Sequence, residues 1–343
     1  MLTYILRRLL FLIPVLFGMT LIAFVVGRTM PTDPVVSAIG DQAATHPAIV
    51  IAYRKKWGLD KPLTEQYLIY MDHLLHGDLG VSIYTHRPVA ADILDYLPAT
   101  VELATAAIII SIAVAVPLGV ISAVKRGGII DFAVRMVSLV GVAMPIFFLA
   151  LLSISVLYVW LGIVPSPSRL SLIATPPPRV TGLYTIDSLL AGQFSTFADA
   201  LAHLILPALV LASWSIGLLL RVTRTATLSV LHQDYLRTAR AKGAREFYVI
   251  RRHGLRNALI PVVTIIGLSY GDLLSGSILI ETIFAWPGIG RYAYTAATEA
   301  DFPAIIGVAL MVAFFYTIVN LVVDVVYALL DPRVRSTIMA IRR

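Results

Sequence analysis

The chain has 343 residues, of which 58% are hydrophobic and only 14% are charged, and its mean hydropathy is +0.86. A soluble domain of this length could not bury so much apolar surface in one core, whereas a bilayer solvates apolar side chains on the outside of a helix bundle. The net charge of +7 does not indicate nucleic-acid binding, because aromatic residues do not alternate with the basic ones as on a base-stacking surface. The absence of cysteine excludes disulfides and thiolate metal sites.

Six mainly apolar stretches are long enough to cross a bilayer, which requires about 20 residues per helix. They cover residues 9–26, 99–123, 133–161, 201–220, 258–284 and 304–329. The first follows Arg7 and Arg8 as a signal peptide would, but no small-x-small cleavage site comes after it, so we interpret it as a retained helix. We therefore predict an all-α, polytopic membrane protein with about six transmembrane helices.

The basic residues collect in alternate connections between these stretches. Most of the 27 Lys and Arg residues lie at the two ends of the chain, between the second and third stretches, and between the fourth and fifth. Because such an excess marks the cytoplasmic side of a membrane protein, we expect both termini in the cytoplasm. The predicted organisation is an N-terminal end with the first helix over 1–28, an extracytoplasmic region over 29–98, and a transmembrane core over 99–343 with a cytoplasmic loop at 221–257.

Two extracytoplasmic connections are long enough to hold structure of their own. In the first, Tyr67, Met71, Leu74 and Leu75 recur at helical spacing and predict a small amphipathic helix. The second, over residues 161–200, is rich in proline and serine and is expected to be irregular. No internal repeat is visible, so an inverted-repeat transporter fold gains no support.

The loop at 221–257 predicts two short amphipathic helices with a bend between them. Asp234 can cap the first helix, and Gly243 ends it and permits the bend. The apolar positions of the pair are Leu236, Ala239, Phe247 and Ile250. This pattern indicates either a knob that inserts into a groove of another protein or a basic loop that binds anionic lipid headgroups.

Polar residues inside the apolar stretches need an explanation, because a charge at the bilayer centre costs on the order of 3 kcal/mol. Asp272 lies mid-span in the fifth stretch with no basic residue within one turn, and Ser269 lies near it. We expect Asp272 to line an aqueous pathway or to pair across helices with hydroxyls of the fourth stretch, Ser213 and Ser215. The stripe of Gly267, Gly271 and Ser275 predicts a helix-packing face.

Three other titratable residues carry a weaker signal. Glu102 and Glu281 lie nearer the outer surface, where they could reach water, and His203 is expected at the membrane interface rather than in a catalytic site. The sequence contains no phosphate-binding GxxxxGK[ST] loop, no HExxH and no GxSxG. We predict no catalytic residues, no metal site and no cofactor in this chain, so any ATP that drives transport must bind a different chain.

Four stretches of the sequence resemble one family in order along the chain. Residues 234–261 read DYLRTARAKGAREFYVIRRHGLRNALIP, and the others are RRLLFLIPVLFGMTLIAFVVGRTMPTDPV at 7–35, GLDKPLTEQYL with HGDLGVSIYTHRPV at 58–89, and ETIFAWPGIGRYAYTAATEADFPAIIGVAL with NLVVDVVYALLDPRVR at 281–335. Together they resemble the B-type permease subunit of dipeptide and oligopeptide importers of the ATP-binding-cassette class. In the coupling loop of such importers, Gly243 and Ala239 match the pattern, whereas Arg237 and Arg256 stand where the general pattern has glutamate and proline.

The resemblance implies a type I importer permease fold in the bacterial inner membrane. It also implies a second homologous permease subunit, two cytoplasmic ATPase subunits that bind ATP and Mg²⁺, and an extracytoplasmic substrate-binding protein. The coupling residues would be Leu236, Ala239, Gly243, Phe247 and Ile250. The implied substrate is a dipeptide or short oligopeptide, with nickel, glutathione or haem-type compounds as alternatives on the same architecture.

Two functions of other classes remain open from the residues alone. An ion-coupled secondary transporter would use Asp272 or Glu102 as a proton site and would leave the loop at 221–257 without a role. A scaffold or intramembrane enzyme is the other, although no nucleophile and base occur at a suitable depth. Copurification with ATPase subunits would separate these possibilities.

Overall fold

The computed structural model describes residues 2–29 and 46–330, and every regular element in these ranges is a helix. The predicted all-α class is therefore confirmed. Four helices of the described part are long and apolar enough to cross a membrane. They are α5 (Val89–Val124), α9 (Phe194–Leu231), the helix Glu246–Ser275, which ends in α12 (Leu255–Ser275), and α15 (Phe302–Leu330).

The remaining two predicted spans correspond to a bent helix and to the N-terminal helix. The pair formed by α6 (Ile129–Ala143) and α7 (Ile146–Ser153) with η1 (Ile154–Trp160) is bent by 104°. The N-terminal helix α1 (Leu2–Thr29) contains an apolar stretch over Ile13–Val25. These elements account for the six apolar stretches of the sequence.

Two of the predicted continuous helices are broken, and that part of the prediction was wrong. The stretch 133–161 breaks at Met144, which is extended (φ −77°, ψ 130°), because the residue before a proline is disfavoured in the helical region and Pro145 follows. The stretch 258–284 breaks after Ser275, where Gly276 caps α12 and a separate helix, α13 (Ile278–Ile283), begins. The segment 161–200 is also less irregular than expected, since it contains α8 (Tyr184–Leu190) and the start of α9.

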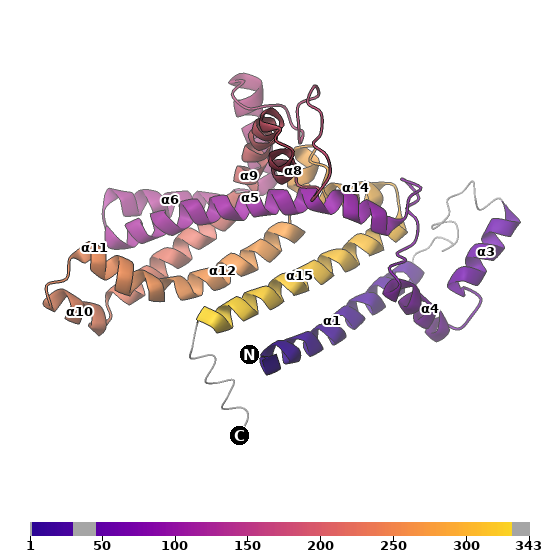
Figure 1. Cartoon of the computed structure of the whole chain (residues 1–343), viewed down its shortest axis with the longest axis horizontal. Helices are drawn as coiled ribbons and strands as arrows, with labels where there is room; N and C mark the ends of the chain where they lie inside the picture. The colour runs from indigo at the N-terminus through magenta and orange to yellow at the C-terminus, as the bar shows by residue number, and fades with distance from the viewer. Residues whose placement is uncertain (1, 30–45, 331–343) are drawn as a thin grey trace.

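The core lies where α5, α9 and α12 pack together, with α15 and α1 outside them (Figure 1). Small residues permit the close approaches. A Cβ at Gly119 would lie 2.7 Å from Cβ of Thr223, and one at Gly267 would lie 2.1 Å from Cγ2 of Val323. At Gly271 the nearest atom would be Cε2 of Tyr316, at 3.0 Å. The predicted packing role of the Gly267–Gly271 stripe is thereby confirmed, and α15 is the helix it contacts.

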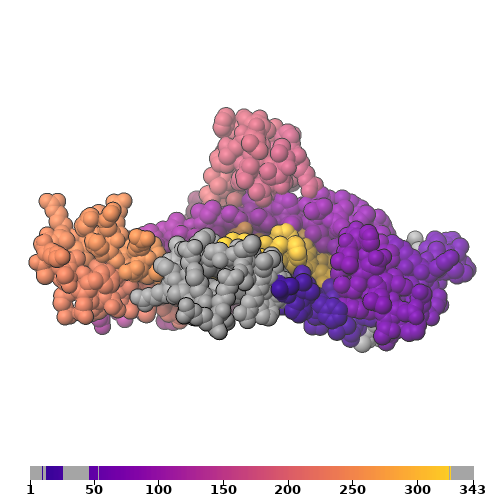
Figure 2. Space-filling model, turned by 60° about the horizontal axis from the view of Figure 1, so that its bottom comes forward, coloured from indigo at the N-terminus to yellow at the C-terminus, as the bar shows by residue number. Residues whose placement is uncertain are grey.

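The short helices gather at opposite ends of the bundle. The helices α10 (Asp234–Ala241) and α11 (Glu246–Tyr248) lie at one end, while α3 (Pro47–Trp57) and α4 (Leu63–Leu75) lie at the other (Figures 1 and 2). The helix α1 runs toward α3 and α4, whereas α15 runs back toward α10 and α11. The predicted helix around Tyr67 is α4, and the hydroxyls of Tyr67 and Thr20 of α1 share a hydrogen bond of 2.8 Å.

A protrusion rises from the side of the bundle (pink in Figure 2). It consists of η1, the proline- and serine-rich segment that follows it, and α8. Leu172 and Ile173 in that segment are 100% and 96% exposed, so two large apolar side chains have no contact within the described chain. A short helix, α14 (Ile289–Thr298), closes the adjacent part of the bundle.

Candidate functional site

The loop between α9 and α12 folds as two short helical segments around a bend at Gly243. The first segment is α10, and the second is α11 continued by η2 (Val249–Gly254) into α12. Gly243 has φ +81°, and a Cβ built on it would meet no atom within 4 Å. The glycine is therefore required for its left-handed backbone and not because a neighbour fills the space. The two predicted helices and the bend are confirmed.

The two segments pack on each other, and one of the predicted docking residues, Leu236, lies inside this contact. Leu236 of α10 is completely buried, as is Val249 of η2, and Leu236 lies close to Gly254. The expectation that Leu236 faces a partner is therefore corrected, since its side chain stabilises the loop itself. Ala239 and Ile250 are half-buried, whereas Phe247 is 73% exposed and Tyr248 is 50% exposed.

Polar contacts fix the loop in this shape. Arg240 donates two hydrogen bonds to Glu246, at 3.0 and 2.9 Å, which join α10 to α11. Asn257 donates to the hydroxyl of Tyr235 at 2.9 Å and joins α10 to α12. Asp234 is the first residue of α10 and not its cap, because the N-cap position is occupied by Gln233, which makes no side-chain capping bond. The surface that the loop presents is thus Phe247 and Tyr248 surrounded by basic residues.

A second candidate site is a cavity of about 280 Å³ near the middle of the bundle. Met144 and Ile146 line it at the break between α6 and α7, Ser213 and Trp214 contribute from α9, and Asp272 contributes from α12. The neighbouring Gly271 packs against Tyr316, which is central in α15, and Ser213 is central in α9. Along α9 and α15 the cavity is therefore near the middle of the bundle, and Asp272 itself lies in the last turn of α12.

Asp272 is exposed in this cavity, and its carboxylate has no hydrogen-bond or ion-pair partner within residues 2–29 and 46–330. Ser213, which the sequence paired with it, lines the same cavity and donates its hydroxyl to the carbonyl of Val210 at 2.7 Å. Ser215 and Ser269 lie elsewhere. Both are buried, and neither hydroxyl has a hydrogen-bond partner in the described part of the chain.

Glu102 does not reach water, contrary to the expectation from sequence. It is 6% exposed and forms an ion pair with Arg169, whose Nε and Nη2 donate to the same carboxylate oxygen at 3.0 and 2.6 Å. Thr185 donates to the other oxygen through its backbone and its hydroxyl, at 2.8 and 2.7 Å. The guanidinium of Arg169 also stacks 3.6 Å from the ring centre of Tyr184. This network attaches the protrusion to α5.

Glu281 is also enclosed, because its carboxylate lies under the turn that begins α14. It is completely buried and accepts hydrogen bonds from Thr100 and Ser277, both at 2.7 Å, and from the backbone N–H of Arg291 at 3.0 Å. A Cβ at Gly288 would lie 2.4 Å from the carboxyl carbon of Glu281. The glycine of the WPGIG sequence thus lets the backbone close over the acid. Interactions at such sequence distance could not be read from a one-dimensional pattern.

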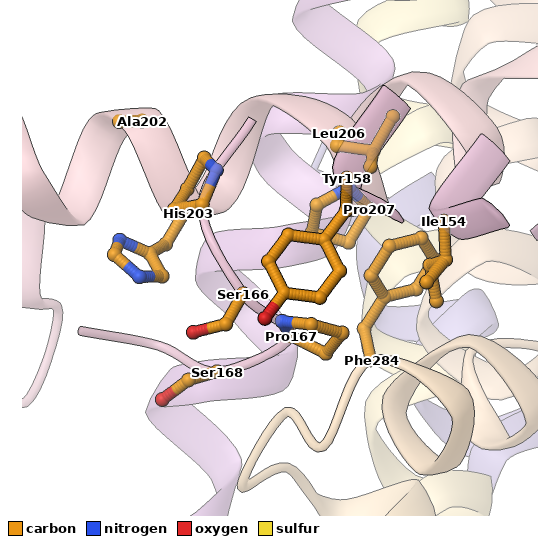
Figure 3. Close-up of a pocket in the computed structure, with 11 residues that line it drawn as sticks. Ile154, Tyr158, Ser166, Pro167, Ser168, Ala202, His203, Leu206, Pro207 and Phe284 are labelled. Atoms are coloured by element: carbon orange, nitrogen blue, oxygen red, sulfur yellow. The ribbon is translucent and has the colours of Figure 1, made fainter. Parts of the chain in front are cut away.

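His203 is 4% exposed, so its side chain is buried within the chain, and its position at the membrane interface stays a prediction. Its Nδ1 lies 2.8 Å from the carbonyl oxygen of Asp199. The small cavity beside it, between Tyr158, Pro167 and Phe284, has a volume of only about 10 Å³ (Figure 3). Such a volume holds one water molecule at most and no substrate, so we assign His203 a role in packing.

Asp187 holds the base of the protrusion. It is 1% exposed and accepts hydrogen bonds from the backbone N–H groups of Val180, Thr181 and Gly182 at 3.2, 2.8 and 2.8 Å. Burial alone would raise the pKa of Asp187, but these donors, with the hydroxyl of Thr181, outweigh it and lower the pKa below its usual value. The sequence contained no signal for this role.

The helical fold, with its long apolar helices, is that of a membrane-embedded permease. The chain belongs to the family of binding-protein-dependent transport system inner membrane components, whose profile matches residues 115–336, and the N-terminal profile of such membrane components matches residues 1–104. It is accordingly a multi-pass inner-membrane permease subunit of an ATP-binding-cassette importer. Members of this family are transport components, so the predictions that the chain is not an enzyme and binds no cofactor agree with its membership.

Individual relatives match almost the whole chain. It is 44% identical to the probable D,D-dipeptide transport system permease protein DdpB of Escherichia coli K12, with 94% of each chain covered. It is also 44% identical to the di/tripeptide transport system permease protein DppB of Pseudomonas aeruginosa UCBPP-PA14, with 98% of this chain and 99% of that protein covered. The oligopeptide transport system permease protein AppB of Bacillus subtilis 168 is 37% identical, over 97% and 99%.

A solved structure shows the same fold. It is a chain of the MetNI methionine ABC transporter in an inward-facing conformation, with a TM-score of 0.50 and 16% identity over 68% of this chain and 93% of that chain. At this identity the likeness concerns the fold alone. The predicted importer-permease fold is thereby confirmed.

Proposed function

We propose that this chain is the permease subunit through which dipeptides or short oligopeptides enter the cell. The observation that carries the proposal is its 37–44% identity, over nearly the full length, to permeases named for dipeptide, di/tripeptide and oligopeptide transport. The direct test is uptake of a labelled dipeptide by cells in which this system is the only peptide importer. Uptake that disappears on deletion supports the proposal, whereas uptake of nickel, glutathione or haem without any peptide uptake would overturn it.

We infer an assembly with a second homologous permease, two cytoplasmic ATPase subunits and an extracytoplasmic binding protein. The family description requires a binding protein. We infer that the binding protein contacts Leu172 and Ile173 of the protrusion, because both apolar side chains are almost completely exposed. We infer that an ATPase contacts Phe247, which is exposed in the loop between α9 and α12. Copurification that yields this chain with ATPase subunits would support the assembly, and uptake independent of any ATPase would favour ion-coupled transport instead.

The proposed orientation places the loop at 221–257 and both termini in the cytoplasm, with residues 29–98 outside. The arginine excess of the loop supports this side, and α3 and α4 lie at the end of the bundle opposite α10 and α11. Because the chain has no cysteine, single cysteines at Lys242 and Lys55 can report the orientation. A membrane-impermeant thiol reagent should label the second and not the first in intact cells, and the reverse result would overturn the orientation.

The proposed mechanism follows from the continuity of one helix. Residues Glu246–Ser275 form a single 30-residue helix that carries Phe247 at one end and Asp272 near the other. A movement of a bound ATPase against Phe247 would therefore be transmitted along this helix to the cavity at Asp272. Closure of the ATPases on ATP would then bias the permease between inward-open and outward-open states.

A further inference from the structure

The cavity at Asp272 combines features that seldom occur together inside a membrane protein. Its volume is about 280 Å³, and its lining contains one carboxylate and no Lys, Arg or His. The carboxylate has no hydrogen-bond or ion-pair partner among the described residues. A carboxylate charge inside a membrane protein is costly unless a ligand or water compensates it, so the cavity favours a positively charged ligand.

The groups around Asp272 fit one kind of cation. The hydroxyl of Ser213 donates its proton to the carbonyl of Val210, so its oxygen lone pairs remain available as an acceptor. The indole of Trp214 is 39% exposed and lines the same cavity, and an indole face attracts an organic cation. A carboxylate, a hydroxyl acceptor and an indole together match an ammonium group, which has three N–H donors and one charge.

A metal ion fits the same lining poorly. Ca²⁺ needs about six to eight oxygen ligands, and Mg²⁺ needs near-octahedral oxygen coordination. The side chains of this cavity supply the carboxylate oxygens of Asp272 and the hydroxyl oxygen of Ser213, and the rest of the lining side chains are apolar or indole. A ligand that carries a carboxylate is disfavoured as well, because the negative charge of Asp272 would repel it.

We propose that this cavity is a transit site for the α-ammonium group of the transported peptide, held by Asp272, Ser213 and Trp214 during passage through the membrane. The inference rests on the proposed function, because a dipeptide carries one such group at its N-terminal end. It adds to that function a specificity-determining site within the permease, separate from the binding protein.

The site can be tested with a single cysteine on this cysteine-free chain. Met144→Cys lines the cavity but leaves the three recognition residues intact. In the assembled permease–ATPase complex without binding protein, its modification by a small cationic methanethiosulfonate is measured with alanyl-alanine or N-acetyl-alanyl-alanine present. Since protection scales as 1 + [L]/Kd, alanyl-alanine at ten times its apparent Kd should slow the reaction about tenfold, and the acetylated peptide should not.

Three variants control the measurement. Ser275→Cys lies on α12 but lines a different, small cavity with Tyr316, so its modification should be insensitive to both peptides. Asp272→Asn in the Met144→Cys background should abolish protection and reduce the preference for a cationic over an anionic reagent, whereas Asp272→Glu should restore both. Copurification of the ATPase with each variant verifies that the complex is assembled.

The outcomes separate this inference from the proposed function. Equal protection by both peptides, protection that survives Asp272→Asn, or no protection by either peptide would each overturn the ammonium site. Dipeptide uptake by the unaltered complex in proteoliposomes with its binding protein is measured in parallel. If that uptake is present while protection fails, the chain is a peptide permease without this site, and if it is absent the proposed function itself fails.

Discussion

The carboxylates in the core of this protein fall into two groups with opposite surroundings. Glu102 and Glu281 are buried, and each accepts three or more hydrogen bonds, at least one of them from a residue distant in sequence. Asp272 is exposed to a cavity and has no such partner among the described residues. A buried charge with all its hydrogen bonds satisfied holds elements together, whereas an uncompensated charge beside a cavity is available to a ligand. Hydropathy alone treats the three residues alike.

The strongest test of this contrast is Glu281→Ala. The substitution would leave the buried donors of Thr100, Ser277 and Arg291 without their acceptor around an empty space, and each unsatisfied buried donor costs about 1–3 kcal/mol. We expect the chain to fail to accumulate in the membrane. Immunoblotting of membrane fractions gives the level, with the exposed Glu299→Ala as a control that should accumulate normally. Normal levels for both variants would refute a structural role for Glu281.

The buried ion pair of Glu102 and Arg169 should also stabilise the fold, with a smaller effect on folding than the loss of Glu281. Either single change, Glu102→Leu or Arg169→Met, leaves one buried charge unpaired. We expect each to lower the free energy of unfolding of the purified complex, followed by thermal denaturation, by about 3 kcal/mol or more. The double variant should recover much of the loss, because no isolated charge remains. Strict additivity of the two losses would show that the residues do not act as a pair.

The loop at 221–257 provides a contrast of its own between buried and exposed apolar residues. Phe247→Ala should leave the loop folded but weaken retention of the ATPase by about 2 kcal/mol, since exposed aromatic anchors dominate docking contacts. Leu236→Ala should instead loosen the loop itself, because that side chain is completely buried. Copurification of the ATPase, together with protease sensitivity of the loop, distinguishes the two losses. Unchanged retention with Phe247→Ala would indicate that the loop contacts lipid headgroups.

Local and compositional features were the part of the fold that sequence could predict. Apolar length identified the four long apolar helices, the bent pair and the N-terminal helix, and the spacing around Gly243 identified two helices and a bend. Helix breaks at Met144 and Gly276 were missed because both lie inside apolar runs that a hydropathy window averages.

Side-chain partners were less predictable because they depend on packing between distant segments. Leu236 and Phe247 look equivalent on a helical wheel, and only the contact with η2 makes the first inaccessible. Asp272 and Ser213 were correctly associated to the extent that both line one cavity, since both are polar residues within long apolar stretches. Arg169 was not associated with Glu102, because it lies in an irregular segment without periodicity.

The smallest expected effect concerns Asp187, which extends the contrast to the protrusion. Folding lowers the pKa of this carboxyl, so its contribution to stability is fully present above the unfolded pKa of about 4 and is lost as pH falls through the lower folded value. Asp187→Asn cannot accept the same charge-assisted hydrogen bonds and should make the segment 180–187 open more easily at pH 7, by about 1–2 kcal/mol. Hydrogen exchange of the Thr181 and Gly182 amides, corrected for intrinsic rates, measures this opening. The difference between the variant and the unaltered chain should narrow toward pH 3, because protonation of Asp187 removes the same charge. A difference that is constant over this range would mean that the carboxylate charge does not stabilise the protrusion.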